Sequence, residues 1–138
     1  MLTSLGIDII EIDRVRQAIQ RRPRLAPRLF TPRERAYCDQ RSDSAPHYAA
    51  RFAAKEATAK VLGRPLRWHD VEIVSLPSGQ PTLALSGEAA ALARVADGWR
   101  LLVSLSHSRE HAVACVALIS PQAAEGAGDN LLPPGVWT

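Results

Sequence analysis

Three charged side chains are placed where they could do chemistry: Asp8, Glu56 and Lys60. Glu56 and Lys60 are four residues apart in an alanine-rich stretch that favours a helix, so they share one side of it. Asp8 stands within a run of apolar residues. Because burying an ionised carboxylate is expensive, Asp8 must be protonated, paired or bound to a cation.

Each of these residues also has a purely structural interpretation. Glu56 and Lys60 can be an ordinary surface ion pair one helical turn apart. Asp8 can pair with an arginine or cap the next helix. Lysine usage favours a functional role, because the seventeen basic residues include only two lysines, Lys55 and Lys60. This bias indicates positions that favour a compact ammonium group over a planar guanidinium.

The elements that must position these residues can be predicted from periodicity. Residues 2–10 alternate as a strand that sets Leu5, Ile7 and Ile9 on one face and Gly6, Asp8 and Ile10 on the other. Gly6 leaves room for a ligand to approach the backbone. A helix with Asp13 as its N-cap should follow and end at Pro23, with residues 24–28 in a loop.

Two further helices are predicted before the middle of the chain. Thr31 and Glu34 form a capping box for a helix that runs to about Arg41. A longer helix begins at Ala45 or Pro46 and ends at Gly63. It carries Glu56 and Lys60 beside an apolar stripe made by Ala53, Ala54, Ala57 and Val61.

The second half of the chain is mainly strands. Residues 70–76 and 81–85 form a hairpin, and a short alanine-rich helix follows over 86–96. Residues 100–106 and 112–120 form another pair of strands, and the last is apolar enough to be central in its sheet. Ser106 and His107 are adjacent on a strand and so face opposite ways, which argues against a nucleophile and base pair.

Composition predicts one soluble cytoplasmic domain over residues 1–120, with a mobile tail over 121–138. Of the 138 residues, 46% are hydrophobic and 22% charged, and no apolar run is long enough to span a membrane. Cys38 and Cys115 are far apart and lack metal-type spacing, so neither a disulfide nor a cysteine metal site is expected. A zinc site at His107 and His111 remains a minor alternative.

A strongly basic segment lies near the N-terminus. Between Asp13 and Arg41 there are nine arginines and three acidic residues, a net charge of +6. Such a segment is either a solvated face or a docking surface for an acidic partner. Nucleic acid is less favoured, because only Phe30 and Tyr37 in this segment could stack on bases.

Three segments together resemble the short phosphopantetheinyl transferases, the holo-acyl-carrier-protein synthase family. They are Gly-Ile-Asp-Ile at 6–9, Phe-Ala-Ala-Lys-Glu-Ala-Thr-Ala-Lys at 52–60 and Val-Ser-Leu-Ser-His-Ser at 103–108. The resemblance covers residues 4–118. It implies an α+β fold with an antiparallel sheet packed against a long central helix, in a homotrimer with active sites between subunits. The implied reaction transfers 4′-phosphopantetheine from coenzyme A to a serine of an acyl carrier protein and releases adenosine 3′,5′-bisphosphate.

The resemblance also implies residue roles. Asp8 and Glu56 would hold Mg²⁺ against the coenzyme A pyrophosphate, and Lys60 would neutralise charge there or donate a proton. Glu56 or a metal-bound water would be the base. Lys60 and Arg51 would contact coenzyme A, with Ser106 and His107 from the neighbouring subunit. The loop over 63–66 is shorter than the glycine-rich loop common in this family.

The resemblance also implies a partner for the basic segment. Four arginines would receive the acidic carrier protein: Arg14, Arg21, Arg24 and Arg28. Whether that carrier serves fatty-acid or polyketide synthesis stays open. A second hypothesis is a non-catalytic module that binds an acidic protein through the arginine-rich helix, and a nucleic-acid binder is the third and weakest.

Overall fold

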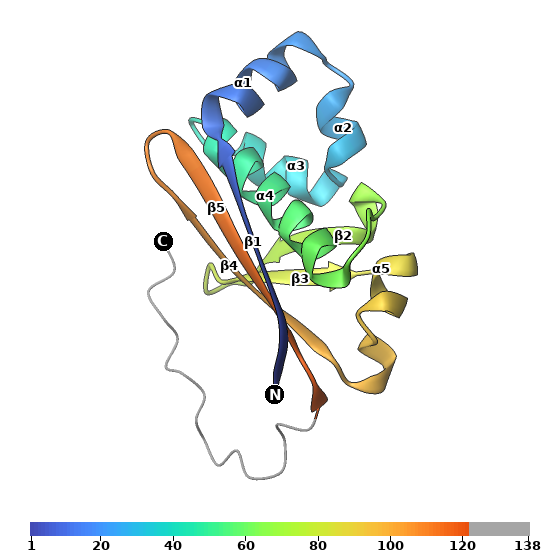
Figure 1. Cartoon of the computed structure of the whole chain (residues 1–138). Helices are drawn as coiled ribbons and strands as arrows, with labels where there is room; N and C mark the ends of the chain where they lie inside the picture. Colours follow the sequence, from blue (N-terminus) through green and yellow to red (C-terminus); the bar gives the residue numbers. More distant parts are fainter. Residues whose placement is uncertain (122–138) are drawn as a thin grey trace.

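The computed structural model describes residues 1–121 and has an α+β architecture (Figure 1). The tail predicted over 121–138 lies, apart from Pro121, outside the described residues. Three long strands form one antiparallel sheet: β1 (Leu2–Glu11), β4 (Arg100–His107) and β5 (His111–Ile119). Their order is β1-β5-β4, so the most continuously apolar strand is central, as the sequence predicts.

The helix α4 (Ala45–Leu62) crosses one face of this sheet and packs mainly against β1 and β5 (Figure 1). Its predicted apolar stripe forms the core with Val103, Ala114 and Val116. The helix ends where predicted, because Gly63 adopts the left-handed conformation with φ of 80°. The stripe is mostly alanine, so helix and sheet can approach closely.

Gly6 shows how close this approach is. A Cβ atom at Gly6 would lie 2.5 Å from the carbonyl oxygen of Ala57 and 2.7 Å from a methyl carbon of Val61. The space beside Gly6 is therefore filled by α4, and the prediction that a ligand approaches there is wrong. The glycine is needed for helix packing instead, because any side chain would push α4 away from β1.

Three helices precede α4: α1 (Ile12–Arg21), α2 (Leu25–Leu29) and α3 (Pro32–Asp39). The N-cap of α1 is Glu11, not Asp13 as predicted, because strand β1 runs directly into the helix. The short helix α2 replaces the predicted loop. Pro27 is tolerated within it because the first residues of a helix need no backbone donor.

The predicted capping box of α3 is confirmed. Glu34 N donates to the hydroxyl of Thr31 at 3.2 Å, and Thr31 N donates to the carboxylate of Glu34 at 2.9 Å. Glu34 is also fully buried, which a capping residue on a surface helix would not be. The carboxylate therefore has a second purpose beyond capping α3.

The remaining elements lie between α4 and β4 in the sequence. A 3₁₀ turn, η1 (Trp68–Asp70), leads into the predicted hairpin of β2 (Val71–Ser75) and β3 (Pro81–Leu85). The helix α5 (Gly87–Leu92) is shorter than predicted, because Arg94 adopts a left-handed φ of 56° and a 3₁₀ turn, η2 (Val95–Asp97), follows. No helix among residues 1–121 is long and apolar enough to cross a membrane.

The face of the three-stranded sheet opposite α4 carries exposed apolar side chains. Leu5, Ile7 and Ile9 on β1 are each about 60% exposed. In the strand register Ile7 pairs with Cys115 and Ile9 with Val113, so β5 extends the same surface. We call this surface the outer face of the sheet.

Candidate functional site

Asp8 and Lys60 meet between the sheet and α4. The ammonium nitrogen of Lys60 lies 3.0 Å from Asp8 Oδ1 and donates to the carbonyl oxygen of Ile7, also at 3.0 Å. The Asp8 side chain is only 15% exposed, whereas that of Lys60 is 55% exposed. Lys60 thus pairs with the strand, and no surface ion pair of Glu56 with Lys60 is present among the described residues.

Asp8 and Glu56 lie close enough to affect each other. Burial raises the pKa of the Glu56 carboxyl above its usual value of 4.5, and the negative charge of Asp8 raises it further, against the opposing effect of Lys60. The other carboxylate oxygen of Asp8, Oδ2, is buried and has no hydrogen-bond partner. Two acidic groups from distant segments therefore share one site, and Asp8 Oδ2 has no hydrogen-bond partner there. We call Asp8 and Glu56 the acid pair.

This donor set fits a magnesium ion. No group of three or more His, Cys, Asp or Glu residues within residues 1–121 could by itself hold a metal. Magnesium typically binds one or two carboxylates and takes its other ligands from water and substrate phosphates. Asp8 and Glu56, with the unpartnered Oδ2, supply that minimal set.

A pocket of about 370 Å³ opens beside this pair, between α4 and the segment that follows it. Glu56 and Lys60 line it from the helix, and Arg64, Arg67 and Trp68 line it from the opposite wall. Lys55 also lines the pocket, and four cationic side chains around one pocket favour an anionic ligand, such as a phosphate group.

The structure places Arg51 on another side of α4. It is 3% exposed, donates to the Ser75 hydroxyl at 3.2 Å and lies 4.0 Å from the centre of the Tyr37 ring. Its Nε atom is buried without a partner. Arg51 therefore lies near the first turns of α4, away from Asp8 and Glu56.

His107 also lies near the first turn of α4, and Ser106 does not face the acid pair. The His107 ring centre lies 5.8 Å from that of His47, in the first turn of α4. Glu56 is nine residues further on, about 13 Å along the helix axis. Ser106 pairs with Val113 and so points to the outer face, away from Asp8. One chain alone does not bring Ser106 and His107 to the acid pair.

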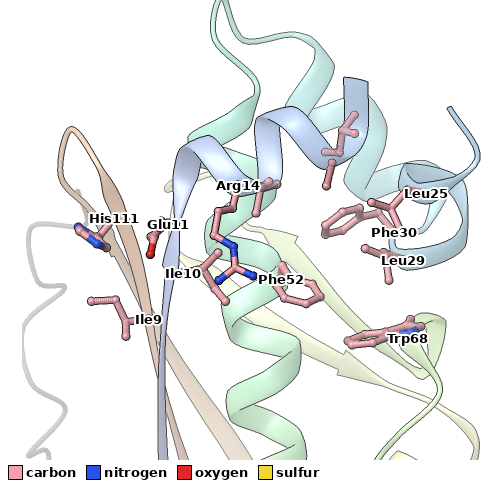
Figure 2. A pocket seen from close by; sticks show the side chains of 13 residues that line it. Ile9, Ile10, Glu11, Arg14, Leu25, Leu29, Phe30, Phe52, Trp68 and His111 are labelled. Carbon is pink, nitrogen blue, oxygen red and sulfur yellow. The ribbon is translucent and has the colours of Figure 1, made fainter. Parts of the chain in front are cut away.

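The predicted docking arginines lie at the surface of the N-terminal helices. Arg14, Arg21, Arg24 and Arg28 are all exposed, and none forms an ion pair within the described part of the chain. Arg14 also borders an apolar pocket of about 520 Å³ between α1, α2 and α4, where its guanidinium points toward Phe52 (Figure 2). The surface thus combines unpaired positive charge with an apolar recess.

Comparison with known proteins decides the family. Residues 4–116 match the sequence profile of the 4′-phosphopantetheinyl transferase superfamily.

The chain belongs to this superfamily.

Similar proteins within this superfamily are named holo-[acyl-carrier-protein] synthase. One from Geobacter sulfurreducens is 46% identical over 88% of this chain and 100% of its own length. A crystal structure of a holo-(acyl-carrier-protein) synthase from Bacillus anthracis in complex with CoA (3′,5′-ADP) has a TM-score of 0.72 and 32% identity, covering 87% of this chain and 98% of that one. One from Neisseria meningitidis has a TM-score of 0.75 and 27% identity, covering 87% and 100%.

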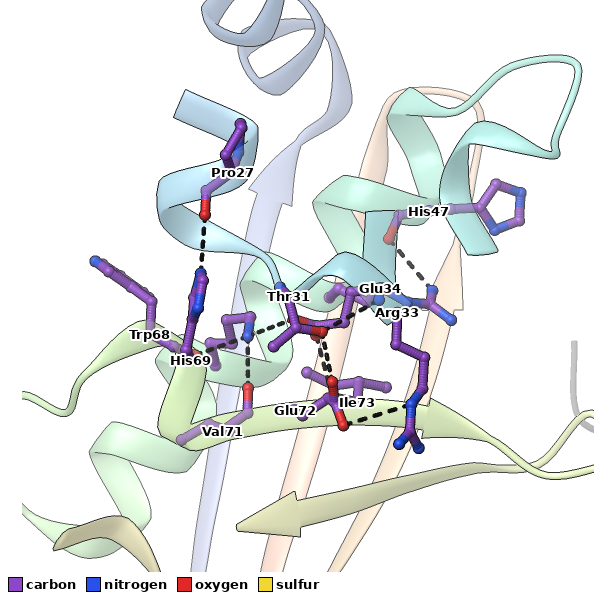
Figure 3. Close-up of polar contacts among 12 residues, drawn as sticks. Pro27, Thr31, Arg33, Glu34, His47, Trp68, His69, Val71, Glu72 and Ile73 are labelled. Carbon is purple, nitrogen blue, oxygen red and sulfur yellow. Dashed lines mark hydrogen bonds and ion pairs between the residues drawn. The ribbon is translucent and has the colours of Figure 1, made fainter. Parts of the chain in front are cut away.

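In this transferase chain the structure also reveals a buried ion pair that sequence reasoning missed. Lys55 is 2% exposed, and its ammonium nitrogen lies 2.8 Å from Glu34 Oε1. Glu34 and Lys55 stand among the polar contacts that join α3 to β2 and α4 to η1 (Figure 3). The scarcity of lysine singles out Lys55 in the sequence. The sequence does not identify Glu34 as the partner of Lys55, because the capping box already explains the Glu34 carboxylate.

Proposed function

We propose that this protein is a cytoplasmic holo-acyl-carrier-protein synthase. It transfers 4′-phosphopantetheine from coenzyme A to a serine of an acyl carrier protein and releases adenosine 3′,5′-bisphosphate, with Mg²⁺. The observation that carries this proposal is the acid pair, in which Asp8 keeps an unpartnered carboxylate oxygen beside Glu56. A site with two carboxylates and a cationic pocket suits phosphoryl transfer, in which catalysis is mainly positioning and charge stabilisation.

Asp8 and Glu56 would hold the Mg²⁺ ion. When bound, the ion supplies Lewis-acid polarisation of the phosphoryl group and offsets charge on the leaving phosphate. Lys60 stands at the exposed mouth of the site, where its ammonium group can bind the same phosphates. Glu56 or a water held by the ion would be the base that accepts the serine proton.

We assign further coenzyme A contacts to Arg51, Ser106 and His107. The guanidinium of Arg51 supplies positive charge near the first turns of α4, and the exposed ring of His107 offers a donor to an anionic group. Because His107 and the acid pair lie at different ends of α4, these two residues would serve the acid pair of a neighbouring subunit. The coenzyme A molecule would then lie between two chains.

A homotrimer meets this requirement. Asp8 of the acid pair lies on β1 and His107 on β4, which are the opposite edges of the sheet. A closed ring of identical chains brings one edge of each subunit to the other edge of the next. The exposed apolar side chains of the outer face would be buried in such a ring, and large exposed apolar patches commonly mark interfaces.

The acidic carrier protein would dock on Arg14, Arg21, Arg24 and Arg28. These exposed arginines form no competing ion pairs among the described residues, so their charge is available to a partner. The apolar pocket beside Arg14 could receive an apolar side chain of the carrier. Serine attack would then take place at the adjacent acid pair.

The alternative is a non-catalytic module that binds an acidic protein through the same arginines. Incubation of the purified protein with an apo carrier, coenzyme A and Mg²⁺, followed by mass spectrometry of the carrier, separates the two. We expect a mass gain equal to one phosphopantetheine on the carrier serine, abolished by omission of coenzyme A. Binding of the carrier without any mass gain would favour the non-catalytic module.

A further inference from the structure

The buried ammonium group of Lys55 has three hydrogen-bond partners. It donates to Glu34 Oε1 at 2.8 Å, to the carbonyl oxygen of Trp68 at 2.8 Å and to the carbonyl oxygen of Val71. A lysine ammonium has three donors, so each one is used. Two of the three bonds go to the backbone of the segment that runs from α4 into β2. Lys55 therefore links α4 to that segment.

Glu34 holds the ammonium group in place. Its carboxylate is also buried and accepts the backbone N–H groups of Thr31 at 2.9 Å and Ile73 at 3.1 Å (Figure 3). A buried ion pair contributes little net stability compared with apolar side chains of similar size. Stability alone is therefore a weak reason for this pair, whereas its geometry fixes α3, α4 and β2 relative to one another.

The segment that Lys55 links is a wall of the pocket beside the acid pair. Residues 63–68 line this pocket opposite Glu56 and Lys60. Backbone hydrogen bonds tie the two ends of this wall to its neighbours, from Gly63 and Arg64 to Ala59 and from Asp70 to Arg67. Its side-chain restraints, apart from Lys55, are few among the described residues: the Trp68 ring stacks on Phe52 at 5.4 Å, and Arg64 pairs with Glu88 at 3.1 Å where both side chains are about half exposed. An exposed pair of this kind contributes little. The hydrogen bonds of Lys55 are thus the buried side-chain contacts that hold this wall against α4.

We propose that Lys55 is a positioning residue that fixes the wall formed by residues 63–68, and with it Arg64 and Arg67, for binding of the coenzyme A phosphates. The inference rests on the proposed function, since it assigns these phosphates to the pocket. The Lys55 side chain lines the pocket, but its ammonium group uses all three donors on protein acceptors, so none is left for the ligand. Its effect on the reaction passes through the wall.

Removal of the ammonium group should therefore weaken coenzyme A binding more than carrier binding. The variant Lys55→Met keeps the length of the side chain but leaves the buried Glu34 carboxylate unpaired, so we expect it to be strongly destabilised. The double variant Glu34→Gln/Lys55→Met removes both charges and keeps a hydrogen-bonding group at position 34. Both variants lose the donor to Trp68 and Val71.

The matched control is Thr58→Val. Thr58 is fully buried in the same helix and donates to the Ala54 carbonyl oxygen at 2.7 Å, but this bond stays within α4. The measurements are the KM for coenzyme A, the KM for the carrier and hydrogen exchange of the backbone amides in the full-length protein. The control reports the effect of losing a buried hydrogen bond that does not involve the wall.

We expect the double variant to raise the KM for coenzyme A about tenfold, as for loss of one charge-assisted hydrogen bond, with the carrier KM unchanged. Amide exchange should accelerate at residues 63–68 and stay near the parent rate in β1 and β5. An unchanged KM for coenzyme A, or faster exchange spread evenly over the chain as in Thr58→Val, would overturn the inference. If the parent protein itself does not modify the carrier, the proposed function fails instead.

Discussion

At the scale of single residues, the two carboxylate oxygens of Asp8 in the acid pair differ: one has a partner and the other has none. Lys60 neutralises Asp8 Oδ1 across 3.0 Å, while Oδ2 has no partner. Lys60 lowers the pKa of the Glu56 carboxyl, but burial together with Asp8 keeps that pKa raised. Two carboxylates that disfavour each other's charge form a site that a divalent ion would relieve.

This electrostatic arrangement predicts the titration of Glu56. In the metal-free protein the folded chain holds the Glu56 proton more tightly than the unfolded chain, so this group favours folding at low pH and disfavours it as pH rises above 4.5. Asp8→Asn removes one cause of the raised pKa and frees Lys60, so the pKa of Glu56 should fall. NMR titration of the Glu56 side-chain carbon measures it, and an equal pKa in both proteins would contradict the convergence of the two carboxylates.

Sequence reasoning located the acid pair but not the partner of each group. Asp8 stood out because a carboxylate in an apolar strand needs compensation, and that argument is local. The pairing of Lys60 with Asp8, rather than with Glu56 on its own helix, depends on how α4 lies on β1. The contact of Lys55 with Glu34 joins residues 21 positions apart and equally depends on tertiary packing.

At the scale of elements, the site depends on the close approach of α4 to β1. Asp8 comes from the strand and Glu56 from the helix, so their separation is the separation of the two elements. Gly6 and the alanine stripe permit the close contact. Any substitution that widens this gap should therefore reduce both stability and activity.

The variant Gly6→Ala tests this dependence. Its methyl group would overlap the Ala57 carbonyl oxygen, so we expect a loss of about 1–3 kcal/mol in the free energy of unfolding. The carrier modification rate should fall as well, because Asp8 is two residues away. Chemical denaturation measures stability, and Ala84→Val, at an exposed strand position, is the control. Parent-like stability and rate in Gly6→Ala would show that the close packing is not required.

Elements with a strong local signal were predicted well. The capping box of α3, the C-terminal glycine of α4 and the hairpin of β2 and β3 each follow from local chemistry. The errors lie where the tertiary fold overrides a local signal. Strand β1 continues without a break into α1, which moves the N-cap to Glu11, and packing on η1 stabilises α2 despite Pro27.

At the scale of the whole molecule, two surfaces carry the proposed interactions with other chains. The N-terminal helices carry the exposed arginines, and the outer face of the sheet carries exposed apolar side chains. The strand alternation that sets Leu5, Ile7 and Ile9 on one face was predictable from the sequence. Which face would be covered by α4 was not, because both faces of β1 contain apolar residues.

The outer face predicts the assembly. Ile7 is 62% exposed there, so Ile7→Asp should prevent trimer formation while the monomer stays folded. Light scattering measures the molar mass, and carrier modification should be lost with the trimer because the proposed site lies between chains. The control is Val95→Asp, at an exposed apolar residue outside the sheet. A parent protein that is monomeric yet fully active would contradict the shared site.

The arginine surface predicts a selective effect on the carrier. Arg14→Glu reverses an exposed charge, so we expect the KM for the carrier to rise about tenfold and coenzyme A affinity to stay unchanged. Arg100→Glu reverses an exposed charge outside the basic segment and serves as the control. Steady-state kinetics measures both constants, and equal carrier KM in Arg14→Glu and the parent would exclude Arg14 from the docking surface.

The central claim is that Asp8 and Glu56 together hold one divalent ion. It is tested most directly by the rate of carrier modification as a function of Mg²⁺ concentration in the parent, Asp8→Asn, Glu56→Gln and the double variant. We predict that each single variant loses about 100-fold or more, and that the double variant is no slower than the slower single variant, because the two groups act as a unit. Parent-like rates and Mg²⁺ dependence in either single variant would contradict the claim.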